Sequence, residues 1–174
     1  KATIFLPTAK GIQEAAERLR HGGLVAFPTE TVYGLGADAR DEAAVRRIFS
    51  VKGRPLTDPL IVHVPTLEAA LDLLYLDGEG LQVFRKLAEQ FWPGALTLIG
   101  RAKDSLPSCV TAETGFVGVR CPSHPLAQQL LEVSGVPIAA PSANRFGHVS
   151  PTTAQHVLSD LGTADIGVLD GEGA

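Results

Sequence analysis

The chain has 174 residues, of which 45% are hydrophobic. This length supports one full-sized hydrophobic core and is too short for two ordinary ones. The net charge of −4, from 15 basic and 19 acidic residues, argues against a protein that coats nucleic acid by bulk electrostatic attraction. We therefore expect a single domain that binds any anionic ligand in a pocket.

Cysteine usage and hydropathy indicate a cellular compartment. Cys109 and Cys121 belong to no C-x-x-C pair and no zinc-like cluster, which favours two free thiols in a reducing cytosol over a disulfide framework. No apolar run approaches the roughly 20 residues of a membrane span, and no signal peptide opens the chain. These observations predict a cytoplasmic protein without membrane association.

Helical and strand-like patterns alternate along the chain. In order they predict helix 11–20, strand 24–27, helix 41–49, strand 60–64, helix 66–74, helix 80–92, strand 95–99, strand 116–120, helix 124–135, strand 137–140, helix 150–158 and strand 166–170. The alternation is typical of an α/β fold around a largely buried sheet. Since the link between strands 95–99 and 116–120 has no helical pattern, we expect that pair to be antiparallel and the sheet to be mixed.

The stretch "FPTETVYGLGADA" crowds polar groups and glycines into the segment after the strand 24–27. Gly34, Gly36 and Ala39 match G-x-G-x-x-A, but a dinucleotide site needs that turn directly after the strand and an acid at the end of the next strand. The next strand instead ends in Val64 and Pro65. The glycines alone are equally typical of a backbone turn. Polar groups at the carboxyl end of a buried strand nevertheless lie where open α/β sheets bind ligands.

Two further segments carry groups suited to a phosphate-containing ligand. Lys52 and Arg54 are placed in a loop after a helix, where lysine offers a point charge and arginine a planar fork to polyphosphate. Ser142, Asn144 and Ser150 follow the strand 137–140 and could ligate phosphate or ribose. Each has a simpler interpretation: a solvated surface pair for the two cations, and turn chemistry for the hydroxyl and amide groups.

Two residues at strand ends are equally ambiguous when each is taken alone. His63 in "LIVHV" is typical of a buried histidine satisfied by a hydrogen bond, and Arg120 ending "FVGVR" is typical of an ordinary strand-end charge.

Taken together and in order, five blocks resemble the YrdC-like domain of threonylcarbamoyl-AMP synthases. They are "FPTETVYGLGADA", "KGRPLTDPLIVHV", "FWPGALTLI", "VGVRCPSHP" and "PIAAPSANRFGHVSPT". The resemblance runs from about Gly11 to Gly171. It implies a cytosolic nucleotidyltransferase that joins L-threonine, bicarbonate and ATP into threonylcarbamoyl-adenylate and releases pyrophosphate. A partner transferase complex would then modify the adenosine beside the anticodon in tRNAs that read codons starting with A.

The resemblance also implies a fold and site residues. The fold would be a twisted mixed parallel and antiparallel α/β sheet flanked by helices, with a concave and locally basic face. The family's K-x-R…S-x-N signature and two further ATP contacts fall on Lys52, Arg54, Ser142, Asn144, Phe116 and Ser150. The threonine pocket falls on Thr31, His63, Arg120 and Ala140, with the "PTETVYG" loop as a wall. Mg²⁺ is expected with ATP, and no protein-held metal is predicted. Lys52 and Arg54 are assigned to electrostatic stabilisation, and the base for the threonine amine stays open.

One departure from the family pattern concerns the end of the chain. Family members continue beyond this point into an E-S-T-[IV]-[VI]-D strand or a second domain, whereas the sequence ends at Ala174. We therefore expect residues 1–174 to be a single catalytic domain truncated before that strand or extension.

Two alternative functions stay open. A module for double-stranded RNA, tRNA or ribosomes would use the same basic face, with its charge from Arg46, Arg47, Lys52, Arg54, Arg101 and Lys103. A domain that handles carbamoyl-adenylate, as in hydrogenase-maturation proteins, is the other alternative. Such domains normally stand beside zinc-finger and acylphosphatase parts, of which this sequence has no sign.

Overall fold

The structure is a computed structural model and describes residues 1–171. Its strands are β1 (Thr3–Phe5), β2 (Val25–Pro28), β3 (Tyr33–Asp38), β4 (Ile61–His63), β5 (Leu74–Tyr75), β6 (Leu98–Ala102), β7 (Phe116–Arg120), β8 (Ile138–Ala139) and β9 (Gly167–Leu169). Its helices are α1 (Ala9–Arg20), α2 (Glu42–Lys52), α3 (Leu67–Leu71), α4 (Gly78–Phe91), α5 (Ser108–Thr111), α6 (Pro125–Ser134) and α7 (Ala154–Leu161). The last three residues of the predicted domain, 172–174, lie outside the described residues.

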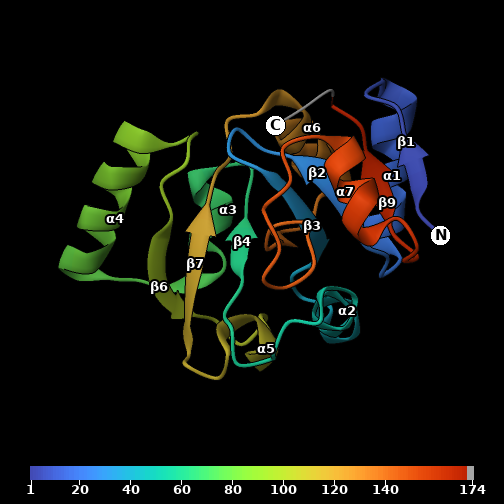
Figure 1. Ribbon diagram of the computed structural model, residues 1–174. Helices are drawn as coiled ribbons and strands as arrows, with labels where there is room; N and C mark the ends of the chain where they lie inside the picture. The colour runs from blue at the N-terminus through green and yellow to red at the C-terminus, as the bar shows by residue number, and fades with distance from the viewer. Residues whose placement is uncertain (172–174) are drawn as a thin grey trace.

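Within residues 1–171 the strands form one nine-stranded sheet in the order β1-β9-β2-β3-β8-β4-β7-β6-β5 (Figure 1). β9 pairs in parallel with β1 and β2, and β4 pairs in parallel with β7. The other pairs, including β6 with β7, are antiparallel. The mixed α/β sheet and the antiparallel pair predicted from the sequence are therefore confirmed.

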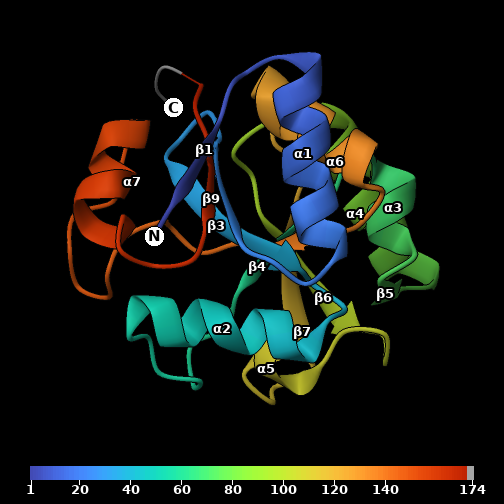
Figure 2. The same cartoon turned by 90° about the vertical axis from the view of Figure 1, so that its right-hand side faces the viewer.

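Two groups of buried side chains form the core. One group joins α1 and α6, which lie side by side (Figure 2), to the strands beneath them. Its α1 members are the residues predicted to share one face, namely Ile12, Ala15, Ala16 and Leu19. The second and larger group includes side chains from α2, α5 and α7 and from the central strands. The core thus holds the central strands in place, and their ends can present polar side chains.

The glycine-containing part of "FPTETVYGLGADA" is a strand, so the sequence-based placement of these residues in a loop is wrong. β3 pairs antiparallel with β2, with Val25 opposite Gly36 and Phe27 opposite Gly34. A Cβ atom on Gly36 would lie 2.6 Å from Cγ2 of Ile138 and 2.8 Å from a ring carbon of Phe27. This glycine is therefore required by close packing inside the sheet, and not by a turn. The connecting segment shortens to residues 29–32.

Other differences from the sequence-based prediction arise where local patterns are short. The predicted helix 66–74 stops after Leu71, and Leu74 begins the edge strand β5. The predicted helix 150–158 starts only at Ala154, because the Thr153 hydroxyl accepts a hydrogen bond from the backbone N–H of His156 and caps it. β1 and α5 had no assignment from the sequence. Three-residue and four-residue elements such as these depend on partners distant in the chain.

Candidate active site

Lys52 is the last residue of α2, and its side chain is buried. The helix ends at Gly53, whose φ of 70° lies in the left-handed region that favours glycine. The Lys52 side chain is 3% exposed, and Nζ donates hydrogen bonds of 2.6 Å to the carbonyl oxygens of Ser142 and Asn144. The sequence-based placement of Lys52 in a loop is therefore wrong. The lysine is a buried helix residue that holds the segment after β8.

The charge of Lys52 is influenced by its surroundings. Burial and the nearby Arg54 charge lower the pKa of Lys52 to about 8, while Asp160 acts in the opposite direction. Both hydrogen-bond acceptors of Nζ are neutral carbonyls. Because no acid is among these hydrogen-bond partners, the positive charge stays available to an anionic ligand.

Arg54 lies beyond the end of α2 and is only partly engaged. Nη2 donates to the carbonyl oxygen of Pro59 at 2.9 Å, and Nε lies 3.7 Å from a carboxylate oxygen of Asp58. That Nε is buried and has no hydrogen-bond partner. A buried N–H group without an acceptor costs free energy that a bound acceptor would recover.

Ser142 and Asn144 lie on the segment that follows β8 and runs beside β3 (Figure 1). Ser142 forms an isolated bridge with Gly34. The Asn144 side chain is buried, and Nδ2 donates to the carbonyl oxygens of Arg145 at 2.8 Å and His148 at 2.7 Å. Its Oδ1 has no hydrogen-bond partner.

The unpartnered atoms coincide with the sequence signature. Among the residues that the structure describes, Arg54 Nε and Asn144 Oδ1 are the buried side-chain nitrogen and oxygen atoms without a hydrogen-bond partner. Both residues belong to the K-x-R…S-x-N pattern. A buried polar atom left unpaired in an otherwise satisfied core is an expected property of a ligand site.

Ser150 lies further along the same segment and is exposed. It lines a hollow of about 540 Å³ together with residues of α7 and of the loop before it. The lining residues are Gly147, His148, Val149, Ser150, Pro151, His156, Ser159 and Asp160. Ser150 therefore shares a hollow with His148 and Asp160. The carbonyl oxygens of Ser142 and Asn144 instead both accept hydrogen bonds from Lys52.

Arg120 joins the predicted threonine residues. It is the last residue of β7, and its side chain is largely buried at 8% exposed. Nε donates to the Gly94 carbonyl oxygen at 3.1 Å, Nη1 to the Thr31 hydroxyl at 3.3 Å and Nη2 to Glu30 Oε1 at 2.6 Å. The structure thus brings Thr31 and Arg120 together from positions 89 residues apart.

Glu30 is one of the polar residues that the sequence places after the strand 24–27, but no specific role was assigned to it from the sequence. Its second carboxylate oxygen, Oε2, accepts 2.9 Å hydrogen bonds from both the backbone N–H and the hydroxyl of Ser123. Burial pushes the pKa of Glu30 upward, but the hydrogen bonds from Ser123 and from the Glu30 backbone, with the Arg120 charge, outweigh it and lower the pKa. The carboxylate therefore stays ionised and fixes the guanidinium. The sequence signal for this role was that Glu30 is the only acidic residue in "PTETVYG".

His63 lies beside Arg120 in the sheet, and Ala140 lies on the segment after β8. His63 pairs in register with Arg120 across β4 and β7, and its ring lies edge-on to Phe27 with centroids 5.8 Å apart. Burial and the Arg120 charge lower the pKa of His63 to about 4, so the imidazole is neutral at physiological pH. Nδ1 lies 3.2 Å from the Ile138 carbonyl oxygen, and donation to that oxygen leaves Nε2 as an acceptor. Ala140 is anchored through its N–H to the Ile61 carbonyl oxygen.

One face of the sheet beside Arg120 is exposed and apolar. Residues opposite one another in a register share a face, and Ile61, Gly118 and Ile99 are in register across three strands. Phe116 shares this face with Arg120, because residues two apart in a strand point the same way. Ile61, Phe116 and Ile99 are 38%, 52% and 71% exposed. The predicted ATP contact Phe116 therefore stands on an apolar surface.

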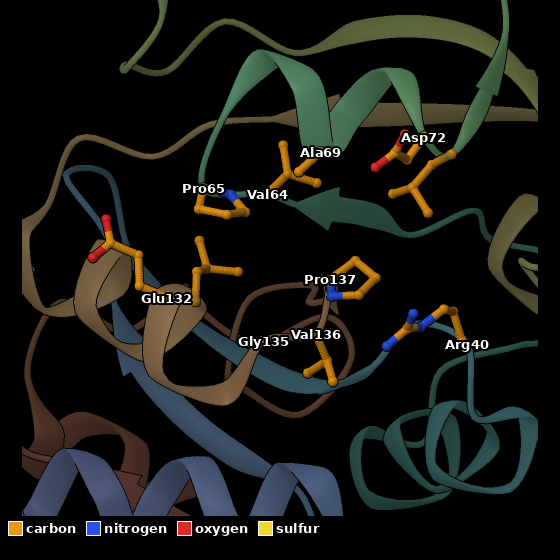
Figure 3. A pocket seen from close by; sticks show the side chains of 11 residues that line it. Arg40, Val64, Pro65, Ala69, Asp72, Glu132, Gly135, Val136 and Pro137 are labelled. Atoms are coloured by element: carbon orange, nitrogen blue, oxygen red, sulfur yellow. The ribbon is translucent and has the colours of Figure 1, made fainter.

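A cavity of about 240 Å³ is lined by residues of α3, of α6 and of the segments beside them (Figure 3). Val64, Pro65 and Ala69 form one side of it, and Gly135, Val136 and Pro137 lie across from them (Figure 3). None of the ten predicted site residues lines it.

Of the six basic residues considered for RNA binding, two lie beside acids and one is buried. Lys52 is buried, Arg46 pairs with Glu42 at 2.9 Å and Arg54 lies 3.7 Å from Asp58. Arg47 donates to the carbonyl oxygen of Gly22. These pairings count against binding of nucleic acid by electrostatic attraction alone.

Residues 1–171 contain no group of three or more His, Cys, Asp or Glu side chains placed to hold a metal ion. In the same part of the chain, no helix combines the length and apolar character needed to cross a membrane.

Comparison with known proteins gives this geometry a context. The threonylcarbamoyl-AMP synthase of Bacillus subtilis is 50% identical over 161 residues, which are 92% of this chain and 46% of that protein. The threonylcarbamoyl-AMP synthase of Vibrio vulnificus is 36% identical, with 92% of this chain and 86% of that protein covered. The crystal structure of P. abyssi Sua5 complexed with L-threonine is 43% identical and has a TM-score of 0.92. The match covers 100% of this chain and 51% of the P. abyssi chain.

The matches cover most of this chain but different shares of its relatives. The chain spans about half the length of the Bacillus and P. abyssi relatives. Residues 17–174 match the family described as "Telomere recombination", named Sua5/YciO/YrdC. Because that match covers most of the sequence and the folds agree along the chain, this protein belongs to the Sua5/YciO/YrdC family.

Proposed function

We propose that this chain joins L-threonine, bicarbonate and ATP into threonylcarbamoyl-adenylate and releases pyrophosphate. The observation that carries the proposal is the pairing of two cation sites. One is built around Arg120 at the end of β7 and the other around Lys52. The segment 140–144 runs from the hydrogen bond of Ala140 with Ile61 on β4 to the two carbonyls that Lys52 holds. Relatives named threonylcarbamoyl-AMP synthase and a relative crystallised with L-threonine support this assignment.

The Arg120 site suits an amino-acid carboxylate. An arginine side chain has five N–H donors, and contacts with Gly94, Thr31 and Glu30 use three of them. One N–H therefore remains on each terminal nitrogen, which matches the two oxygens of a carboxylate. In this assignment Thr31 and neutral His63 lie near the threonine hydroxyl or amine, and Ala140 closes the pocket.

The Lys52 site suits a triphosphate and its nucleoside. The third N–H of Lys52 and the unpartnered Nε of Arg54 are donors for phosphate oxygens. Ser142 and Ser150 add hydroxyl groups from the same segment. The exposed ring of Phe116 offers the adenine base an apolar surface.

The chemistry proceeds in two displacement steps. The threonine amine nitrogen attacks the bicarbonate carbon, a C–N bond forms and an oxygen leaves as water. An oxygen of the resulting carbamate then attacks the α-phosphorus of ATP, and the bond to pyrophosphate breaks. Both steps concentrate negative charge, so fixed cations and aligned reactants are the expected source of acceleration. Lys52 and Arg54 supply the cations, and Mg²⁺ arrives with ATP as part of the substrate.

The product defines the next partner. An acyl-adenylate is an activated donor, so a transferase complex must take the threonylcarbamoyl group to the adenosine of tRNA. A transient contact with tRNA or with that complex follows from this role.

A direct assay tests the activity. The chain is incubated with ATP, bicarbonate and threonine, and pyrophosphate and the adenylate are both measured, with bicarbonate omitted as the control. Serine should be discriminated by only about 1–3 kcal/mol, the value of one methyl-sized contact, and valine much more strongly because it lacks the hydroxyl. Bicarbonate-independent pyrophosphate release, or no adenylate with any amino acid, would reject the proposal.

A further inference from the structure

Asp160 of α7 contacts the segment that carries Asn144. Its contacts are with residues that follow the two carbonyls held by Lys52. Its Oδ2 accepts a 2.8 Å hydrogen bond from the backbone N–H of Arg145, and its Oδ1 lies 2.9 Å from His148 Nδ1. Neither contact belongs to the K-x-R…S-x-N signature. Arg145 and His148 are nevertheless the two residues whose carbonyl oxygens accept from the Asn144 amide.

This arrangement fixes which atom of Asn144 a ligand can use. Both amide hydrogens are taken by carbonyl oxygens, and a carbonyl cannot donate, so the nitrogen must face Arg145 and His148. Oδ1 is left as a buried acceptor without a partner. Asn144 can therefore accept a hydrogen bond from a ligand but has no amide hydrogen left to donate to a phosphate.

We propose that Asp160 is a positioning residue for the nucleotide: it holds Arg145 and His148 so that Asn144 presents Oδ1 to a hydroxyl group or a Mg²⁺-bound water of the bound nucleoside triphosphate. The inference rests on the proposed function. Lys52 holds the Ser142 and Asn144 carbonyls from α2, and Asp160 holds the following residues from α7. The segment is therefore fixed from two helices.

The electrostatics of Asp160 agree with this role. The hydrogen bond from His148 lowers the pKa of Asp160, with further lowering from the Arg145 N–H and the two side-chain charges, so the carboxylate stays ionised. The same charge acts to raise the pKa of Lys52. Asp160 thus supports the segment by hydrogen bonds and the lysine by charge.

Two substitutions separate these contributions. Asp160→Ala removes both hydrogen bonds and the charge, whereas Asp160→Asn keeps an acceptor for the Arg145 N–H and removes the charge and the acceptor that faces His148. Asp165→Ala is the matched control, because that exposed acid pairs with Arg18 and not with the segment. ATP and threonine are titrated separately by calorimetry into each full chain, and thermal unfolding is recorded for all.

The expected result is a split between the two ligands. Asp160→Ala should weaken ATP binding roughly tenfold to a hundredfold, the loss typical of hydrogen bonds to a charged group, with threonine affinity changed less than about twofold. Asp160→Asn should lie between Asp160→Ala and wild type, and Asp165→Ala should match wild type. If Asp160→Ala does not fold, His148→Ala, which removes only one of the two contacts at an exposed side chain, should weaken ATP binding by a smaller factor.

Other outcomes overturn the inference. ATP affinity of Asp160→Ala or His148→Ala equal to that of Asp165→Ala would show that the contact does not position Asn144. An equal loss of ATP and threonine affinity would assign Asp160 to general stability, and an Asn variant as weak as the Ala variant would show that the retained hydrogen bond from the Arg145 N–H does not position Asn144. A wild-type chain that binds no ATP would reject the proposed function together with the inference, whereas wild-type binding with an undisturbed Asp160→Ala rejects the inference alone.

Discussion

Arg120→Lys is the most informative single substitution for the amino-acid site, because it keeps the charge and removes the planar fork. In the structure three guanidinium N–H groups serve Gly94, Thr31 and Glu30, which leaves two for a substrate carboxylate. A lysine ammonium has three N–H groups in total. The ion pair with Glu30 will hold it, so the substrate carboxylate loses its bidentate partner.

The magnitude follows from the bonds that are lost. One hydrogen bond to a charged group contributes about 1.5–3 kcal/mol. Two parallel bonds are lost, and the retained charge offsets part of that loss. We therefore expect threonine affinity to fall by about 2–3 kcal/mol, roughly 30-fold to 150-fold in Kd. ATP affinity should change little, because neither the Lys52 nor the Asn144 contacts include Arg120.

Calorimetric titration of threonine and of ATP measures both effects in one preparation. Arg101→Lys is the matched control, because this substitution makes the same change of head group near the site. Arg101 is exposed on β6, opposite Phe116. Unaltered threonine affinity in Arg120→Lys would refute the carboxylate assignment. An equal fall in ATP affinity would show that Arg120 supports the whole site instead.

Three further predictions concern residues around the two cation sites. Lys52→Ala and Arg54→Ala should each slow adenylate formation by about 2–4 kcal/mol in the transition state. Chemical denaturation should separate them: only Lys52→Ala leaves two carbonyls without their buried donor, so it alone should lower the free energy of unfolding by about 2–3 kcal/mol. For His63, the gap between a pKa of 6.5 unfolded and about 4 folded means that stability is full above pH 6.5 and falls by about 3 kcal/mol as the pH drops toward 4. His63→Gln should flatten that pH dependence, and an unchanged slope would contradict the buried neutral imidazole. For Glu30, the folded pKa lies below 4.5, so its stabilising contribution is present above about pH 4.5 and is lost as the pH falls through the folded value. The difference in unfolding free energy between wild type and Glu30→Gln should accordingly shrink in acid, and a constant difference would exclude the ionised pair.

The sequence predicted the parts of the fold that local patterns determine. Long amphipathic segments such as 11–20 and 80–92 carry enough periodicity to identify a helix, and both are helices in the structure. β3 was missed because its glycines suggest a turn. Gly36 is instead needed because a Cβ atom at this position would clash with Ile138 and Phe27. Ile138 is about a hundred positions from Gly36 along the chain, so no local pattern records its part of this requirement.

For the candidate site, the sequence indicated which residues belong together but not how they are held. The resemblance identified Lys52, Arg54, Ser142 and Asn144 as a set, and the structure brings Lys52 onto the backbone of Ser142 and Asn144. It could not indicate that the Lys52 side chain is buried, because lysine is usually exposed. Nor could it identify Asp160 as a supporting residue, because an acid on a surface helix is ordinarily a solvated charge.

The two cation sites differ in how their charge is balanced, and this difference matches the ligands proposed for them. Arg120 contacts the ionised carboxylate of Glu30, so its charge is largely neutralised, and selection at this site rests on the direction of the remaining N–H groups. The hydrogen bonds of Lys52 go to neutral carbonyls, so its charge is not neutralised by them. A single amino-acid carboxylate needs geometric selection more than net charge, whereas a triphosphate carries several negative charges and needs net positive charge in its site. Because bicarbonate and the carbamate formed from it must lie between the two, the segment 140–144 that connects the sites would also separate a directional binding region from a charged one. Its backbone contacts with Ile61, Tyr33 and Lys52 fix that separation within the sheet.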